Sequence, residues 1–314
     1  MMNAPGEDKP TIHLRLSLTA INRSYLVLVA FCLSLVFSIT ACAPALTPTF
    51  IPSSTPSAEV HTPTITPSPT NTPAFTLTPS PSPTVTLEPV TSISSPLADI
   101  ELSELQSITS QGFSSPSAFV DDGHPAVDLA FFTFEDLPSM YGHPVQAVLP
   151  GTVVMAIEDR FPYGSMILIE TPLEWLADDL LPMNAIPTPI PDGNIDMFNP
   201  CTHDPLYTGL APIEMSNQSR SLYTLYSHLL QKPTYEPGDM VGWGEVIGAV
   251  GLTGNTVAEH LHLEMRIGPS DAKFNSFAMY KPEATIEERY YYCSWSTSGR
   301  FQPIDPAQFW EKYR

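Results

Sequence analysis

From about Pro125 onward the chain consists of short apolar runs separated by glycine and proline. Each run has four to seven residues and is rich in β-branched and aromatic side chains, which favours strands over helices. The glycines between the runs mark turns. The pattern predicts a mostly β domain built on an antiparallel β-sheet. The expected strands are 126–131, 145–148, 152–157, 165–170, 222–226, 246–250 and 261–267.

Two stretches depart from this rhythm. Residues 172–220 are rich in proline and acid, and only 173–181 ("LEWLADDLL") has the composition of a short helix. A connection of this length is unusual within a compact domain, so we interpret 172–220 as a long loop insertion at the domain's rim. The last ten residues, 305–314, predict a short C-terminal helix with Asp305 at the cap and Pro306 at the first helical position.

The first 42 residues have the pattern of an export signal. Three basic residues precede an apolar run at 25–39, which two small residues and Cys42 follow. The "ITAC" at 39–42 resembles the lipobox of bacterial lipoproteins, which implies a lipid on Cys42 and a membrane anchor there. A transmembrane helix is the alternative, because 25–41 approaches the roughly 18 apolar residues that a span needs. Both interpretations place the remaining chain outside the cytoplasm, attached to the membrane.

Residues 43–97 predict a disordered tether. They contain thirteen prolines, thirteen threonines and nine serines among 55 residues, and no lysine or arginine. Such a segment has too little apolar area to form a core, so it stays extended and semi-rigid. A glycosylated stalk or a ligand for a proline-binding partner is the alternative. The folded domain is expected at 98–314, a length that allows one sizeable core.

The net charge of −20 argues against a nucleic-acid partner, which requires basic patches to neutralise phosphate. Cys201 and Cys293 remain once Cys32 is assigned to the signal and Cys42 to the anchor. Outside the cytoplasm a disulfide between them is the default expectation. Metal ligation by these thiols is the alternative, but their neighbours show no ligand spacing.

Histidines supply the candidate chemistry. In a strand, His260, His262 and Glu264 would share one face while the intervening apolar residues enter the core. Taken alone, this pattern is typical of a half-buried strand with a polar outer face. A catalytic zinc site typically takes three protein ligands, and the imidazole of His124 and the carboxylate of Asp128 can supply the others.

Taken together, the motifs resemble the lysostaphin-like, or LytM-type, peptidoglycan metallopeptidases. That family's pattern contains H-x-G-x-D, Y-x-H-L, a glycine-rich run and H-L-H-x-E. This chain has "HPAVD" at 124–128, "LYSHL" at 225–229, "PGDMVGWGEVIGAVGLTGNT" at 237–256 and "EHLHLE" at 259–264. Ala126, Ala258 and Glu259 replace residues usual in the family, which bears on substrate fit more than on metal binding.

The resemblance implies a groove in the sheet domain, with Zn²⁺ as the cofactor. Its implied metal ligands are His124, Asp128 and His262, and its implied catalytic residues are His228 and His260. The reaction implied is hydrolysis of peptide bonds in peptidoglycan stem peptides or cross-links by a zinc-activated water. Tyr226 would either hold the substrate carbonyl or serve the structure. His143 and His203 match no motif and are expected in loops or at the surface.

Two other functions stay open at this point. The chain could be a non-catalytic envelope factor that binds peptidoglycan or activates another wall hydrolase, although such relatives typically lose zinc ligands and this chain retains all three positions. A zinc peptidase acting on extracellular protein is the other alternative. The sequence leaves the oligomeric state open.

Overall fold

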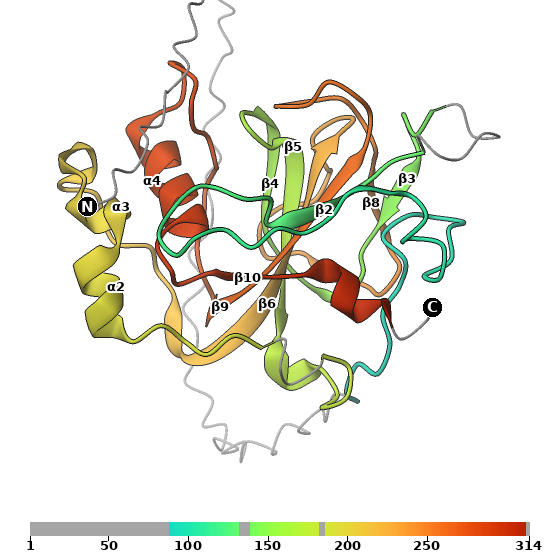
Figure 1. The fold of residues 1–314 in the computed structure, drawn as a ribbon, viewed down its shortest axis with the longest axis horizontal. Coiled ribbons are helices and arrows are strands. Elements are labelled where there is room, and N and C mark those ends of the chain that lie inside the picture. The colour runs from blue at the N-terminus through green and yellow to red at the C-terminus, as the bar shows by residue number, and fades with distance from the viewer. Residues whose placement is uncertain (1–87, 132–138, 182–185, 312–314) are drawn as a thin grey trace, which may run out of the picture. The chain divides into compact units, whose positions relative to one another are not determined.

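A computed structural model describes residues 88–131, 139–181 and 186–311 (Figure 1). The main sheet has eight antiparallel strands in the order β1–β2–β9–β6–β5–β4–β7, with β10 also paired to β9. A separate two-stranded sheet pairs β3 with β8. The strands are β1 Thr109–Gln111, β2 Ala126–Leu129, β3 Pro144–Gln146, β4 Gly151–Arg160, β5 Gly164–Pro172, β6 Ser216–Leu229, β7 Met240–Val241, β8 Val246–Ala249, β9 Leu261–Ser270 and β10 Gln302–Ile304.

The predicted antiparallel β fold is confirmed, and each of the seven expected strands is present. Three further strands, β1, β7 and β10, were not expected. They have only two or three residues each, which is too short for an alternating pattern to stand out.

Both faces of the main sheet are covered. One face packs against residues 93–108, the β3–β8 pair and the 3₁₀ helix η4 (Pro306–Phe309). The other face packs against residues 272–279, Phe301 and helix α4 (Ile286–Ser296). The nearly continuous apolar run of β5 is typical of a strand buried on both sides. Two apolar layers therefore hold the central strands rigidly.

Helix α4 was not predicted. Its sequence, IEERYYYCSWS, mixes acids with tyrosines and presents no clean apolar stripe at a helical period. The helix begins instead with a capping box, in which the Thr285 side chain accepts from the Glu288 amide and the Glu288 carboxylate accepts from the Thr285 amide. Its Trp295 is fully buried against the sheet.

The expected boundary at residue 97 lies inside the folded region. Val90 bridges to Leu176, the Ser94 amide donates to the Val148 carbonyl, and Leu97 is fully buried. The proline- and serine-rich composition of this stretch concealed its isolated apolar residues, which enter the core. The predicted signal and anchor at 1–42, and the tether as far as residue 87, lie outside the described residues. No helix of the described part is long and apolar enough to cross a membrane.

The insertion at 172–220 has more secondary structure than expected. Only Leu173–Trp175 of the predicted helix is helical, as the 3₁₀ helix η1. Three further short helices follow: α2 (Asp192–Phe198), α3 (Pro200–His203) and η3 (Pro205–Tyr207). Side chains of Asn199 and Asp204 cap the last two, each of which begins with proline. Local capping thus shapes a segment whose composition predicted a loop.

A disulfide joins Cys201 of α3 to Cys293 of α4, the pairing expected from the sequence. Tyr207 and Tyr290 pack around it in a small buried cluster. At the other end of the chain, η4 occupies the predicted terminal helix, and the Asp305 side chain accepts from the Ala307 amide as expected. The disulfide thus links the insertion covalently to helix α4, which covers one face of the main sheet.

Removing the disulfide should lower stability without changing the fold. Its cysteines are 92 residues apart, and closing a loop of that size contributes about 2–5 kcal/mol in the chain-entropy treatment. The double variant Cys201→Ala/Cys293→Ala should therefore lose about that much free energy of unfolding, measured by urea denaturation. A reducing agent should destabilise the wild type and leave the variant unchanged. Equal stability of oxidised wild type and variant would contradict this expectation.

Candidate metal centre and active site

Strand pairing brings the first two candidate residues together. In the antiparallel register of β2 with β9, Asp128 lies directly opposite His262, so their side chains emerge on the same face. His124 lies just before β2, where it bridges to Ser114. Residues more than a hundred positions apart in sequence thus meet beside the apolar layer that contains Tyr163 and Trp295.

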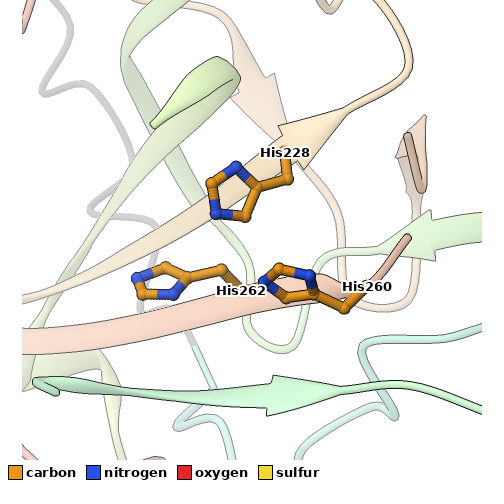
Figure 2. Close-up of side chains that lie close together, drawn as sticks. All are labelled: His228, His260 and His262. Atoms are coloured by element: carbon orange, nitrogen blue, oxygen red, sulfur yellow. The ribbon is translucent and has the colours of Figure 1, made fainter. Parts of the chain in front are cut away.

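A β-bulge places His228. Between the paired residues Ser165↔Leu229 and Ile167↔Tyr226, β6 has one more residue than β5. His228 lies in this bulge with φ of +58°, a left-handed conformation that breaks the alternation of side chains. Its imidazole consequently faces the groove, as Figure 2 shows beside His260 and His262.

In a regular strand Tyr226 would share a face with His228, two residues further on, but in this structure it does not. Because the bulge intervenes, Tyr226 points into the other apolar layer, where it is fully buried. Its hydroxyl accepts from the amide of Val148 at 2.8 Å. The structural role that the sequence left open is the one it has, and Tyr226 does not line the groove.

Asp128 is the centre of the cluster. Its Oδ1 lies 2.9 Å from His262 Nδ1, 3.2 Å from His124 Nε2 and 3.5 Å from His260 Nε2. All four side chains are half-buried or nearly buried. His124, Asp128 and His262 can each offer one ligand atom within 4.8 Å of the others, and His228, His260 and His262 form a second, overlapping set.

Backbone carbonyls define the tautomers of three imidazoles. Nδ1 of His124 is 3.1 Å from the Gly112 carbonyl, Nδ1 of His228 is 2.8 Å from that of Thr253, and Nδ1 of His260 is 2.9 Å from that of Ala258. A carbonyl oxygen only accepts, so each Nδ1 carries the proton. Each Nε2 is then left with a lone pair, as metal ligation or proton transfer requires.

His262 has the opposite orientation. Its Nδ1 faces Asp128, while its Nε2 is buried, has no hydrogen-bond partner and lies 3.8 Å from Glu264 Oε2. Glu264 accepts from the Tyr163 hydroxyl at 2.8 Å and forms a buried ion pair with Arg266. Such a carboxylate behind an imidazole orients the ring and makes its other nitrogen a better ligand.

Glu264 is a residue whose role the sequence did not reveal. Alternation correctly placed it on the face of His262, but Glu264 is fully buried, whereas the pattern taken alone is typical of a polar outer face. The unpredicted helix α4 contributes Trp295, whose ring lies 5.1 Å from the Arg266 guanidinium. The signal available in the sequence was the acid and the arginine that follow His262 at two-residue intervals.

Burial and neighbouring charges shift the pKa values of three side chains in the cluster. Burial opposes ionisation of Asp128, but its contacts with the imidazoles of His124 and His262 hold the pKa of its carboxyl well below its usual range. Burial lowers the pKa of His228 to about 3, so this imidazole is neutral. Burial also disfavours charge on His262, but its contacts with Asp128 and Glu264 raise its pKa to about 9. A cation binding there would compete with that proton.

These side chains open onto a groove of about 460 Å³. His124, Asp128, His228, His260 and His262 all line it. None of the described residues of the insertion, 172–181 and 186–220, lines it. His143 and His203 lie elsewhere, each with Nε2 hydrogen-bonded to a backbone carbonyl.

The donor set fits a divalent metal. His124 and His262 offer nitrogens with fixed orientations, and Asp128 offers the anionic oxygen Oδ1. Two imidazoles and one carboxylate are a ligand set found in catalytic zinc sites, in which a further position stays open. The alternative set of three histidines lacks an anion, so the set containing Asp128 is better suited to balance the charge of the ion.

Comparison with known protein families gives a match to part of this chain. The sequence model of peptidase family M23 matches residues 207–275, which include His228, His260 and His262. The resemblance to lysostaphin-like peptidases is thus confirmed over this segment. His124 and Asp128 lie outside it. No curated protein matches the chain.

Three solved structures illustrate the range of similarity. The catalytic domain of lysostaphin from Staphylococcus simulans has 20% identity and a TM-score of 0.29, with coverage of 55% of this chain and 87% of that one. A mutant catalytic domain of the prophage-encoded M23 protein EnpA from Enterococcus faecalis has 17% identity and a TM-score of 0.31, with coverage of 60% and 92%. A zinc-containing peptidase from Vibrio cholerae has 18% identity and a TM-score of 0.28, and 50% of this chain spans about a third (32%) of its length.

Neutralising Glu264 should weaken metal binding. In Glu264→Gln, His262 loses the anion behind its ring, and we expect zinc affinity to fall about 10- to 100-fold, measured by competition with a chromophoric chelator. The unpaired Arg266 charge should also cost about 3–5 kcal/mol of stability, so affinity is measured well below the melting temperature.

Glu170→Gln is the matched control. Glu170 is also a buried carboxylate, bonded to the Tyr223 hydroxyl and the Asp271 amide, but it contacts no imidazole of the site. Zinc affinity should be unchanged in this variant. An equal loss in both variants would assign the effect of Glu264→Gln to general destabilisation.

Proposed function

We propose that this chain, whose residues 207–275 match peptidase family M23, is a zinc-dependent endopeptidase that cleaves peptide bonds of peptidoglycan stem peptides or cross-links. The observation that carries the proposal is the convergence of His124 Nε2, His262 Nδ1 and Asp128 Oδ1 in a groove shared with two more imidazoles. The motif resemblance and the family match support the substrate class.

Each residue has a distinct task in this proposal. His124, Asp128 and His262 would hold the zinc ion, which would supply a Lewis acid and lower the pKa of a bound water to about 7. His228 and His260 present the lone pair of Nε2 to the groove, because their Nδ1 protons are engaged by carbonyls. Either imidazole can accept the proton of the attacking water and return it to the leaving amine.

The location of the two imidazoles suits such a transfer. Their ring centroids are 4.7 Å apart. A proton that one imidazole takes up therefore lies close to the other imidazole. Burial keeps His228 neutral at physiological pH, so the lone pair of its Nε2 can accept a hydrogen bond from a donor in the groove. The bulge and the left-handed backbone at His228 hold the ring in place, as expected where strain is retained at a functional residue.

Zinc removal and ligand replacement test the function. The purified chain should release soluble fragments with new amino termini from peptidoglycan, and a chelator should abolish this release until zinc is restored. His262→Ala should lose both bound zinc and hydrolysis. His228→Ala and His260→Ala should retain zinc but lose about 10²- to 10⁴-fold in turnover, the usual contribution of general acid–base catalysis.

Other outcomes point to the alternatives. Binding of peptidoglycan without cleavage would favour a non-catalytic envelope factor, and cleavage of denatured protein but not of peptidoglycan would favour an extracellular protein substrate. Full hydrolysis by His262→Ala would refute the ligand assignment.

We also propose that the protein acts outside the cytoplasm, attached to the membrane through a lipid on Cys42. The lipobox-like "ITAC" at 39–42 supports this location, and a disulfide is consistent with an oxidising compartment. The proline-, threonine- and serine-rich segment that follows would then provide reach between the membrane and the wall.

Lipidation is directly measurable. Bacteria expressing the chain and fed an alkynyl fatty acid should label it, and Cys42→Ser should remove the label and release the protein from the membrane fraction. Cys32→Ser is the matched control and should stay labelled. A membrane-bound but unlabelled Cys42→Ser protein would favour the transmembrane alternative.

A further inference from the structure

The groove is lined by acids but, among the described residues, by no lysine or arginine. Its acidic residues are Asp121, Asp122, Asp128 and Glu264. A groove of one sign attracts ligands of the opposite charge. The relevant question is which of these carboxylates is available to a ligand.

Three of the four are already engaged. Glu264 is paired with Arg266, and Asp128 is surrounded by imidazoles at the proposed metal site. Asp122 accepts from the amide of Ser117 at 2.6 Å and from its hydroxyl at 2.8 Å. These contacts hold the loop that precedes His124.

Like Asp122, Asp121 accepts only from neutral donors, but its donors are aromatic side chains that also line the groove. It accepts hydrogen bonds from the hydroxyls of Tyr280 and Tyr292, the latter at 3.1 Å. Both donors are neutral, and no lysine or arginine of the described residues forms an ion pair with this carboxylate. The side chain is exposed to the groove, and its partial burial raises the pKa of the carboxyl. Within the described part of the chain, no lysine or arginine is in direct contact with this charge, and only the more distant Arg266 offsets it.

Aromatic rings surround this carboxylate. Tyr280 and Tyr292 meet edge to face with ring centroids 5.9 Å apart, and Tyr163 lies 5.9 Å from Tyr292. Tyr280 has φ of +63°, a strained conformation for an aromatic residue, and its side chain is half exposed. The neighbouring Lys281 is directed away, onto the ring of Phe161 at 4.6 Å. The strained backbone thus keeps a phenol at Asp121 and a lysine out of the groove.

We propose that Asp121, with the rings of Tyr280 and Tyr292, forms a subsite for a primary ammonium group of the peptide substrate. A carboxylate gives an ammonium charge-assisted hydrogen bonds, and aromatic faces attract the same cation. The chemical class is an unacylated diamino-acid side chain or a free amino terminus. A carboxylate or phosphate at this place would meet only like charge.

The subsite adjoins the proposed metal site. The ring of Tyr163 contacts Tyr292 on one side and His262 on the other, with centroids 5.9 Å and 6.0 Å apart. A peptide lying in the groove could therefore place a cationic residue at Asp121 while a nearby peptide bond reaches His262. The inference rests on the proposed function for the identity of the peptide, but not for the ammonium contact itself.

A small amine tests the contact without any catalysis. The full chain is labelled with 3-fluorotyrosine, treated with a chelator and titrated with n-butylammonium, with n-butanol as the uncharged probe. Tyr280→Phe and Tyr292→Phe assign the two ¹⁹F signals. We expect a saturable shift of both signals with the amine only, and about tenfold or greater weakening in Asp121→Asn.

Glu259→Gln is the matched control, because it removes one negative charge near His260, where Glu259 accepts from Ser139, outside the groove lining. It should bind the amine as the wild type does. The proposal is overturned if the wild type shows no saturable shift, if butanol binds equally well, or if Asp121→Asn and Glu259→Gln weaken binding equally.

Peptidoglycan then tests the link to the substrate. Binding of the chelated chain is compared between untreated peptidoglycan and peptidoglycan whose free amino groups have been acetylated. The wild type should prefer untreated material about tenfold or more, and Asp121→Asn should bind both forms equally. An undiminished preference in Asp121→Asn would overturn the subsite. Loss of all peptidoglycan binding, with amine binding intact, would refute the substrate class and leave the ammonium subsite standing.

Discussion

The candidate site depends on one strand register, which sets Asp128 opposite His262 in the pairing of β2 with β9. A slip of one residue would turn every side chain of a strand to the opposite face. The slip is opposed by the apolar residues between the ligands, since Val127 and Leu263 pair with each other and pack into the other layer. The hydrophobic core therefore aligns the metal-binding atoms as a consequence of its own alternation.

A second constraint is electrostatic. The buried pair of Glu264 and Arg266 is weak evidence for stability, because desolvation offsets much of its attraction. Its position has a more specific consequence for His262. Because Glu264 lies behind Nε2 of this ring, Nδ1, which faces Asp128, is the nitrogen available to an ion. The three remaining imidazoles are oriented by backbone carbonyls instead, so rigid neighbours determine the direction of every lone pair at the site.

The sequence predicts the parts of this arrangement that follow a regular pattern of residues. Alternation located the main strands, and the resemblance of the motifs to a known family identified the histidines and Asp128 that the structure gathers. It could not show that β6 contains a bulge, and this single extra residue separates the environments of Tyr226 and His228. It could not show the burial of Glu264 either, because the covering helix α4 has no clear periodicity. Asp121 belongs to no motif, and only the fold brings it to Tyr280 and Tyr292.

The disulfide has a topological consequence. It closes a covalent ring of chain between Cys201 and Cys293 that contains His228, His260 and His262, whereas His124 and Asp128 lie upstream of the ring. A protease that nicked any surface loop within the ring would leave both cut ends in one molecule. In the proposed location outside the cytoplasm, such a cut would leave the two fragments covalently joined and both sides of the groove in one molecule.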